Sequence, residues 1–178
     1  VLKSTVPLGT NSEIHSKISK KINKDFKVDI VSNPEFLREG SAVNDFLKPE
    51  RIIIGSDSEY AKNTLTALYK PLCRKADKII FMSSESAELT KYSANAFLAT
   101  KISFMNEIAE IAEITGADMH EIRQGIGTDS RIGKDFLYAG LGYGGSCFPK
   151  DLVALTHFQK VNNIQSLLIQ ATQDRNFK

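Results

Sequence analysis

The sequence predicts an α/β fold, in which a parallel sheet is followed by one long helix and a helical C-terminal half. Short β-branched runs alternate with amphipathic stretches up to about residue 83. Beyond that point strand signals nearly vanish, and residues 84–115 contain neither Gly nor Pro. The 178 residues are 42% hydrophobic and 25% charged, which is typical of a globular protein and excludes disordered or low-complexity classes.

Four short apolar runs are expected to form the strands. They cover residues 1–4, 28–32, 51–55 and 78–82. Because helical stretches separate them, the strands should lie parallel in one sheet.

Two helices are expected between these strands. Isoleucines at every fourth position predict the first over 11–23, with Thr10 or Asn11 as its N-cap. The second should cover about 58–68, capped by Asp57 or Ser58.

The longest predicted helix begins at Ser83 or Ser84 and runs to Thr115, where Gly116 is a typical C-terminal stop. Its 31 or so residues would span about 46 Å, which suits a helix that joins two domains or forms a subunit interface. Shorter helices are expected over about 118–126, 150–159 and 164–176.

Charge and composition narrow the classes of partner. The 23 Lys and Arg against 21 Asp and Glu leave a net charge of +2, and no run of like charge suggests nucleic-acid binding. Since no apolar stretch reaches about 18 residues and no signal peptide is evident, we expect a soluble, cytoplasmic protein without a membrane partner. The three histidines lack metal-ligand spacing, so no metal site is expected.

A glycine-rich loop contains Gly140, Gly142 and Gly145 in a G-x-G-x-x-G pattern. The dinucleotide fingerprint needs a strand before it and an acidic residue about 20 positions later, and both signals are missing here. We therefore interpret this segment as a loop whose glycines let the backbone approach a ligand.

Cys147 ends this loop, just before a predicted helix. The helix dipole and Lys150 would favour its thiolate, as in a nucleophile, although a buried structural cysteine is an equal alternative on these grounds. Cys73 has no such setting and is expected to be inert.

Polar residues also mark two other segments. Lys91 and Asn95 lie four apart and so share a helix face, where they could stabilise one oxyanion, although a lone helical Lys is usually solvated. Glu35 and Glu39 follow a predicted strand, at the edge where α/β sheets bind ligands, although such a pair is often only a solvated face.

Four motifs taken together resemble the UDP-glucose/GDP-mannose dehydrogenase family of nucleotide-sugar dehydrogenases. They are KSTVP at 3–7, NPEFLREG at 33–40, ELTKYSANAF at 88–97 and GYGGSCFPKD at 142–151. Their order along nearly the whole chain makes the resemblance specific, and it favours the functional readings of Lys91 and Cys147.

The resemblance implies an NAD-dependent enzyme that oxidises the 6-hydroxymethyl group of UDP-glucose to the carboxylate of UDP-glucuronate in two hydride transfers. Cys147 would form a thiohemiacetal and then a thioester, which holds the aldehyde for the second oxidation. Lys91 and Asn95 would stabilise the oxyanions. Asp151 would act with Thr5 on a water, and Glu35 would take part in acid–base work or thioester hydrolysis.

Further positions inherit binding roles from the same resemblance. On the cofactor side these are Thr5, Glu39 and Lys150. The nucleotide sugar would be contacted by Phe36, Leu37, Lys101, Arg131, Phe136, Tyr143 and Gly144, with Arg131 reaching it from the partner subunit.

The resemblance also divides the chain. Residues 1–83 would be the C-terminal part of a Rossmann-like NAD-binding domain, and residues 84–178 a central helical domain that carries the thiol and forms a homodimer through the long helix. The family's N-terminal G-x-G-x-x-G unit and its C-terminal UDP-binding domain have no counterpart among these residues. We therefore expect a fragment with little or no turnover of its own.

Three alternatives stay open. GDP-mannose and UDP-N-acetylmannosamine dehydrogenases share the layout, although ANAFLA at 94–99 and PER at 49–51 look more like the glucose branch. A non-catalytic dimerisation module would use the long helix alone. An aldehyde dehydrogenase-like enzyme also uses a cysteine thioester, but no other residue supports it.

Overall fold

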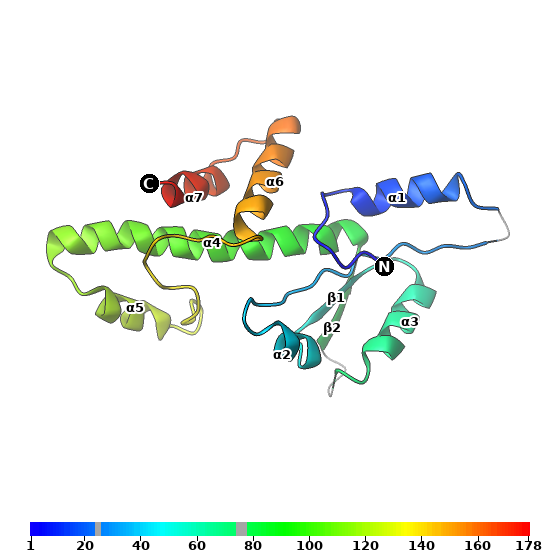
Figure 1. Ribbon diagram of the computed structural model, residues 1–178, viewed down its shortest axis with the longest axis horizontal. Coiled ribbons are helices and arrows are strands. Elements are labelled where there is room, and N and C mark those ends of the chain that lie inside the picture. The colour runs from blue at the N-terminus through cyan, green and yellow to red at the C-terminus, as the bar shows by residue number, and fades with distance from the viewer. Residues whose placement is uncertain (24–25, 74–77) are drawn as a thin grey trace. The chain divides into compact units, whose positions relative to one another are not determined.

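The computed structural model describes residues 1–23, 26–73 and 78–178 (Figure 1). It is α/β, as predicted, with a parallel pair of strands and mainly helical structure after them. The contacts divide the chain into two compact units, Val1–Lys91 and Tyr92–Lys178.

The sheet of the first unit pairs β1 (Ile52–Gly55) with β2 (Ile79–Met82) in parallel. Ile52 lies opposite Ile79, and Gly55 opposite Met82. The strands predicted at 51–55 and 78–82 are therefore confirmed within one residue at each end, as is their parallel direction.

The strands predicted at 1–4 and 28–32 are wrong as continuous strands. Leu2 and Ser32 form one parallel bridge, and Ser32 forms one antiparallel bridge with Gly55. Ser32 exchanges both backbone hydrogen bonds with Gly55 at 2.7 and 3.0 Å, which is the antiparallel pattern. Because the direction of pairing differs on the two sides of Ser32, no regular ladder extends from it.

The first helix, α1 (Thr10–Ser19), is shorter than predicted, and its predicted cap is wrong. Gly9 is the N-cap, with φ of +88°, and no side chain of the cap residue bonds to the first turn. Asn11 is buried inside the helix and donates from Nδ2 to Ser32 Oγ at 3.1 Å, so it is not free to cap.

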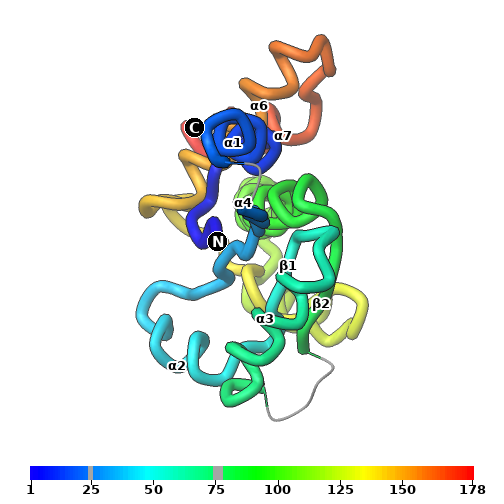
Figure 2. The backbone as a smooth tube through the Cα atoms, turned by 90° about the vertical axis from the view of Figure 1, so that its right-hand side faces the viewer, coloured from blue at the N-terminus to red at the C-terminus, as the bar shows by residue number. Residues whose placement is uncertain are grey.

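The core of the first unit forms where α3 (Glu59–Tyr69) packs on the sheet, and Figure 2 shows this helix beside β1 and β2. The helix begins as predicted at Ser58, whose Oγ accepts a hydrogen bond from Ala61 N at 3.3 Å. The buried core residues are Val31, Ile52, Ile54, Ala61, Leu65 and Tyr69, with Cys73 packed at their margin. A short helix that was not predicted, α2 (Ala42–Leu47), precedes β1.

The long helix is confirmed as α4 (Ser84–Thr115), with 32 residues. At 1.5 Å per residue it is about 48 Å long. Ser83 Oγ accepts from Ser86 N at 3.1 Å at its start, and Gly116 leaves the helical conformation with φ of +72° at its end. Both predicted boundaries hold.

Three shorter helices follow in the second unit. Asp118 caps α5 (Met119–Gly127), close to prediction, while α6 (Phe148–Val161) begins two residues early and α7 (Leu168–Asn176) four residues late. The early start of α6 is explained by Pro149, which is well suited to a first helical turn. α6 packs against α7, and Ser103 of α4 donates to the carbonyl of Thr172 in α7 at 2.9 Å.

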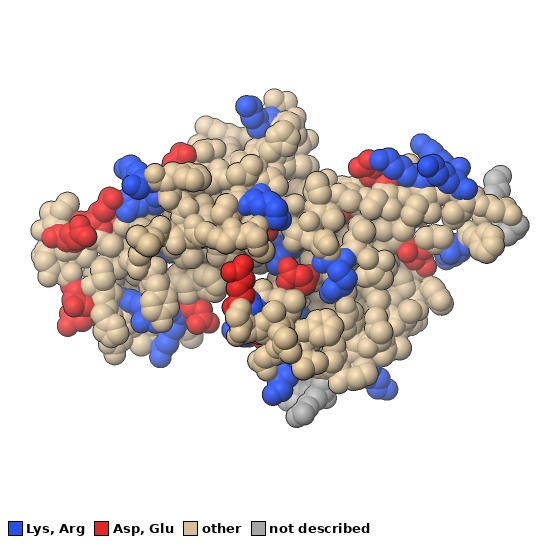
Figure 3. Space-filling view, in the orientation of Figure 1, with Lys and Arg blue, Asp and Glu red and all other residues tan. Residues whose placement is uncertain are grey.

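Charged side chains of both signs are spread over the face drawn in Figure 3. Lysines gather over α1, where Lys17 lies in the last turn and Lys20 is the C-cap, a position that the helix dipole favours. None of the helices in the described ranges is long and apolar enough to cross a membrane.

Candidate functional site

The first unit places Glu35 beside Lys91. Glu35 follows the bridge residue Ser32, and Lys91 lies two turns into α4. Lys91 Nζ is 3.3 Å from Glu35 Oε1, and the lysine is buried while the glutamate keeps 31% of its side chain exposed. The ammonium is thus held by a carboxylate and does not extend into solvent, which argues against the solvated alternative for this lysine.

Aromatic and backbone contacts fix this pair further. Lys91 Nζ lies 5.2 Å from the centre of the Phe36 ring, and Arg51 lies 4.3 Å from the same ring. Glu35 Oε2 accepts a hydrogen bond from Leu37 N at 2.7 Å. The Leu37 amide is therefore occupied within its own motif, and Glu39 is exposed.

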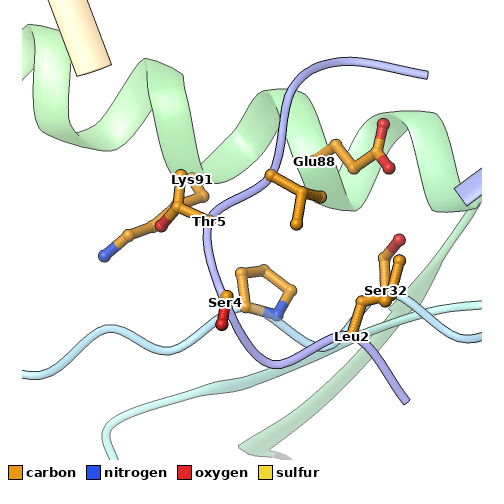
Figure 4. A pocket seen from close by; sticks show the side chains of 8 residues that line it. Leu2, Ser4, Thr5, Ser32, Glu88 and Lys91 are labelled. Carbon is orange, nitrogen blue, oxygen red and sulfur yellow. The ribbon is translucent and has the colours of Figure 1, made fainter. Parts of the chain in front are cut away.

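A small cavity opens beside the pair (Figure 4). It is lined by Leu2, Ser4, Thr5, Val6, Ser32, Pro34, Glu88 and Lys91. Its volume is about 10 Å³, close to the room that one water needs. Thr5 and Lys91, two of the predicted catalytic residues, thus line one cavity that is far too small for a sugar.

Glu88 was not given a role by the sequence, yet its buried carboxylate ties two segments together. Oε2 accepts a hydrogen bond from Gly9 N at 2.7 Å, and Oε1 from Asn11 N at 2.9 Å. These amides belong to the N-terminus of α1, which lacks a cap of its own and favours a negative charge. Its only sequence signal was its place one turn before Lys91 on the same helix.

The second unit brings Asn95, Lys150 and Asp151 together. Asp151 is 1% exposed, and its carboxylate accepts from Asn95 Nδ2 at 2.6 Å and from Lys150 Nζ at 2.5 Å. The hydrogen bond to Asp151 raises the pKa of Lys150, with smaller electrostatic contributions from Tyr92 and Cys147. A buried carboxylate is therefore satisfied by an amide and an ammonium, as burial of a charge requires.

Cys147 is the N-cap of α6, as predicted, and is half-buried. Its carbonyl accepts from Asp151 N at 2.9 Å, and its Sγ lies 3.7 Å from Ser146 Oγ. The thiol thus stands at the positive end of a 14-residue helix, one turn before the buried carboxylate. Cys147 and Cys73 are both free thiols.

Residues 128–147 include no strand, so the strand that the dinucleotide fingerprint needs before its glycines is missing, as predicted. Gly142 and Gly145 have φ of +97° and +78°, a region that suits glycine. Side chains from α4 and α7 hold the loop: Asn106 Oδ1 accepts from Gly140 N, and Asn176 bonds to the backbone of Tyr143. These two asparagines were missed, since no local motif marks them.

The predicted sugar-binding residues of the second unit lie on or near this loop. Lys101 donates to the carbonyl of Ile132 at 3.1 Å. Arg131 is 87% exposed and pairs with Asp129 at 2.6 Å, a contact that lowers the pKa of Asp129 and raises that of Arg131. The roles of these residues in binding stay predictions.

Aromatic side chains of this loop pack against the first residue of α6. Phe136 adopts φ of +62°, and its ring lies 6.1 Å from that of Phe148. Tyr143 is buried, which raises its pKa, whereas a Cβ added at Gly144 would meet open space.

Among the described residues no group of three or more His, Cys, Asp or Glu side chains could hold a metal ion.

Comparison with known protein families places both halves of the chain. Residues 1–73 match the NAD binding domain of the UDP-glucose/GDP-mannose dehydrogenase family, and residues 85–178 match the central domain of the same family.

Individual relatives agree. The UDP-glucose 6-dehydrogenase of Pseudomonas aeruginosa is 49% identical over 99% of this chain, and that of Bacillus subtilis, TuaD, is 49% identical over 100% of this chain. The solved UDP-glucose dehydrogenase of Pyrobaculum islandicum superposes with a TM-score of 0.90 at 41% identity over 98% of the chain. This chain spans 38–40% of the length of each of the three.

Proposed function

Because the chain belongs to the UDP-glucose/GDP-mannose dehydrogenase family, we propose that it supplies the thiol, the oxyanion-stabilising groups and the hydrolytic groups of an NAD-dependent enzyme that oxidises UDP-glucose to UDP-glucuronate. The observation that supports this most directly is the placement of Cys147 at the start of α6, with Asp151 buried one turn later against Asn95. The names of the relatives favour UDP-glucose over GDP-mannose or UDP-N-acetylmannosamine.

In the covalent part of the proposed reaction, Cys147 Sγ adds to the carbonyl carbon of the sugar 6-aldehyde. A C–S bond forms, and the carbonyl π electrons move to oxygen. In this proposal the ammonium of Lys91 and the side-chain amide of Asn95, which pair here with Glu35 and Asp151, would stabilise this oxyanion. Loss of hydride then leaves a thioester on Cys147.

Hydrolysis completes the proposed reaction. A water adds to the thioester carbonyl, the C–S bond breaks, and the thiolate leaves while the carboxylate forms. Asp151 would orient this water together with Thr5, and Glu35 would accept its proton. The contact with Lys91 favours the ionised form of Glu35, which is the form that can accept a proton.

NAD would accept the two hydrides. Glycines occur only at positions 9, 40 and 55 of the NAD-domain segment 1–73, so this segment contains no G-x-G-x-x-G cradle. The cofactor-side roles of Thr5, Glu39 and Lys150 are therefore too few to build a dinucleotide site, and we derive no step through the nicotinamide. For the same reason we propose that the 178 residues alone do not turn over UDP-glucose.

We propose a homodimer through α4. Phe97, Phe104 and Ile111 recur every seven residues on this helix and are 67%, 53% and 53% exposed. Seven-residue spacing places them on one face, which would be covered by the same face of a second copy.

A cytoplasmic setting is part of the proposal, because a reducing compartment keeps a catalytic thiol free of disulfides.

The reactivity of Cys147 tests the proposal against the non-catalytic alternative. We expect iodoacetamide at neutral pH to alkylate Cys147 at least about tenfold faster than Cys73, as followed by peptide mass spectrometry. Cys73 in the same molecule is the matched control. Equal, slow rates for both thiols would favour a dimerisation module without catalysis.

Turnover is tested by exchange of segments. The matched segment of the Pseudomonas aeruginosa relative is replaced by this chain, and NADH formation from UDP-glucose is followed at 340 nm. We expect activity in this hybrid, its loss with Cys147→Ala, and none from the 178 residues alone. A folded hybrid that prefers GDP-mannose would contradict the substrate assignment.

A further inference from the structure

The last residue of α7, Asn176, holds the backbone of Tyr143 from both sides. Its Oδ1 accepts a hydrogen bond from Tyr143 N at 2.7 Å, and its Nδ2 donates to Tyr143 O at 3.0 Å. A primary amide has both a donor and an acceptor, so one side chain satisfies both backbone groups of one loop residue. Tyr143 is 33 residues away in sequence, so this contact joins two distant segments.

The neighbouring Gly142 is adapted to this contact. Its φ is +97°, and a Cβ built on it would lie 2.5 Å from Asn176 Oδ1. Only glycine meets both conditions without strain. The sequence pattern at 140–145 is thus explained in part by a side chain of the same unit.

A second asparagine anchors the loop two residues earlier. Asn106 of α4 accepts from Gly140 N at 2.7 Å through Oδ1, and its carbonyl accepts from Arg175 at 2.5 Å. Arg175 also pairs with Glu110 of α4 at 2.5 Å. The end of α7 is therefore fixed on α4, and Asn176 meets the loop from a supported position.

Packing links the held residue to the thiol. The buried ring of Tyr143 meets the ring of Phe148 nearly edge-on, with centroids 6.1 Å apart and planes at 77°. Phe148 is the first residue of α6 and directly follows Cys147. A shift of Tyr143 would therefore disturb the start of the helix on which the thiol stands.

We propose that Asn176 is a positioning residue for Cys147. It holds Tyr143, and the Tyr143–Phe148 contact in turn fixes the start of α6. The importance of this for catalysis rests on the proposed function, whereas the coupling between Asn176 and the thiol's surroundings does not.

The test uses the 178-residue chain with Cys73→Ser, so that a trifluoromethyl ketone reagent labels Cys147 alone. In the parent chain we expect one narrow ¹⁹F resonance and slow hydrogen exchange of the Tyr143 amide. Asn176→Ala should split or broaden the resonance and accelerate that exchange by about twenty-fivefold, since two hydrogen bonds contribute about fivefold each. Asn176→Asp keeps an acceptor for Tyr143 N but loses the donor, so the exchange rate of the Tyr143 amide should lie between those of the parent chain and Asn176→Ala.

Asn162→Ala is the matched control, because the side chain of Asn162 donates to the carbonyl of Phe158 at the exposed end of α6, away from Tyr143 in sequence. It should leave both signals unchanged. An unaltered ¹⁹F resonance in a folded Asn176→Ala chain overturns the proposal. Altered signals together with equal alkylation of Cys147 and Cys73 in the unsubstituted chain would uphold the positioning role and refute the proposed function instead.

Discussion

Replacing Glu88 of α4 is expected to destabilise the first unit. In Glu88→Ala, the amides of Gly9 and Asn11 lose their acceptor. A hydrogen bond to a charged group contributes about 1.5–3 kcal/mol, so two give about 3–6 kcal/mol. Water can reach the exposed Gly9 amide, and removal of a buried charge relieves desolvation, so we expect a net loss of about 2–4 kcal/mol.

Urea unfolding followed by NMR separates the two units, because each residue reports its own midpoint. Resonances of residues 1–91 should shift to lower urea, and those of 92–178 should not. Glu88→Gln keeps one acceptor, so it should cost about half as much. Glu85→Ala is the matched control, since this exposed carboxylate accepts from Ser12 Oγ and from groups at the start of its own helix, and its loss should cost less than about 1 kcal/mol. A Glu88→Ala chain as stable as the control would refute the reasoning.

Three further predictions concern packing and pH. Gly55→Ala would place a Cβ 2.6 Å from Ala87 Cβ and should lower the free energy of unfolding, measured in urea, by about 1–3 kcal/mol. A Cβ at Gly125 in α5 would meet open space, so Gly125→Ala should raise the free energy of unfolding by about 0.5–1 kcal/mol. Hydrogen bonds from the backbone N–H groups of Glu121 and His120 lower the pKa of Asp118. The contribution of this carboxylate to stability should therefore be complete above about pH 4 and be lost as the pH falls through the lowered pKa. A curve of stability against pH for Asp118→Asn should lack this loss at acid pH. Burial raises the pKa of Tyr143, which favours the neutral phenol in the fold. Ultraviolet titration should therefore show an ionisation above the ordinary range of tyrosine, and Tyr143→Phe should remove it; an unchanged titration would contradict the assignment.

Elements governed by local signals were predicted well. The ends of α4 follow from Ser83 and Gly116, and Ser58 caps α3 as expected. The placement of Cys147 at the start of α6 also follows from residues close to it in sequence. In each case the deciding contacts lie within about four residues, which is the range that a sequence pattern can report.

Elements that depend on distant partners were predicted less well. The cap of α1 was assigned to Thr10 or Asn11, whereas the carboxylate that meets its first amides comes from Glu88, 77 residues from Asn11. The strand at 28–32 is reduced to bridges, because Ser32 pairs with Leu2 and Gly55 in opposite directions. No local pattern specifies either arrangement, since both depend on which segments meet in space.

Two of the contacts that sequence reasoning missed stabilise their segments in the same way. Glu88 and Asn176 each use a side chain on a helix to satisfy backbone groups of a distant, glycine-containing segment, at Gly9 and next to Gly142. Glycine gives such a segment the conformation it needs but lowers its stability, because it leaves more freedom in the unfolded chain. A side chain on a helix offsets that loss with hydrogen bonds from a rigid support. One segment continues from Thr5 and the other leads to Cys147. Two of the residues that we propose to be catalytic are thus connected to segments that a helix side chain supports, so we expect substitution of Glu88 or Asn176 to change their surroundings without removing a catalytic group.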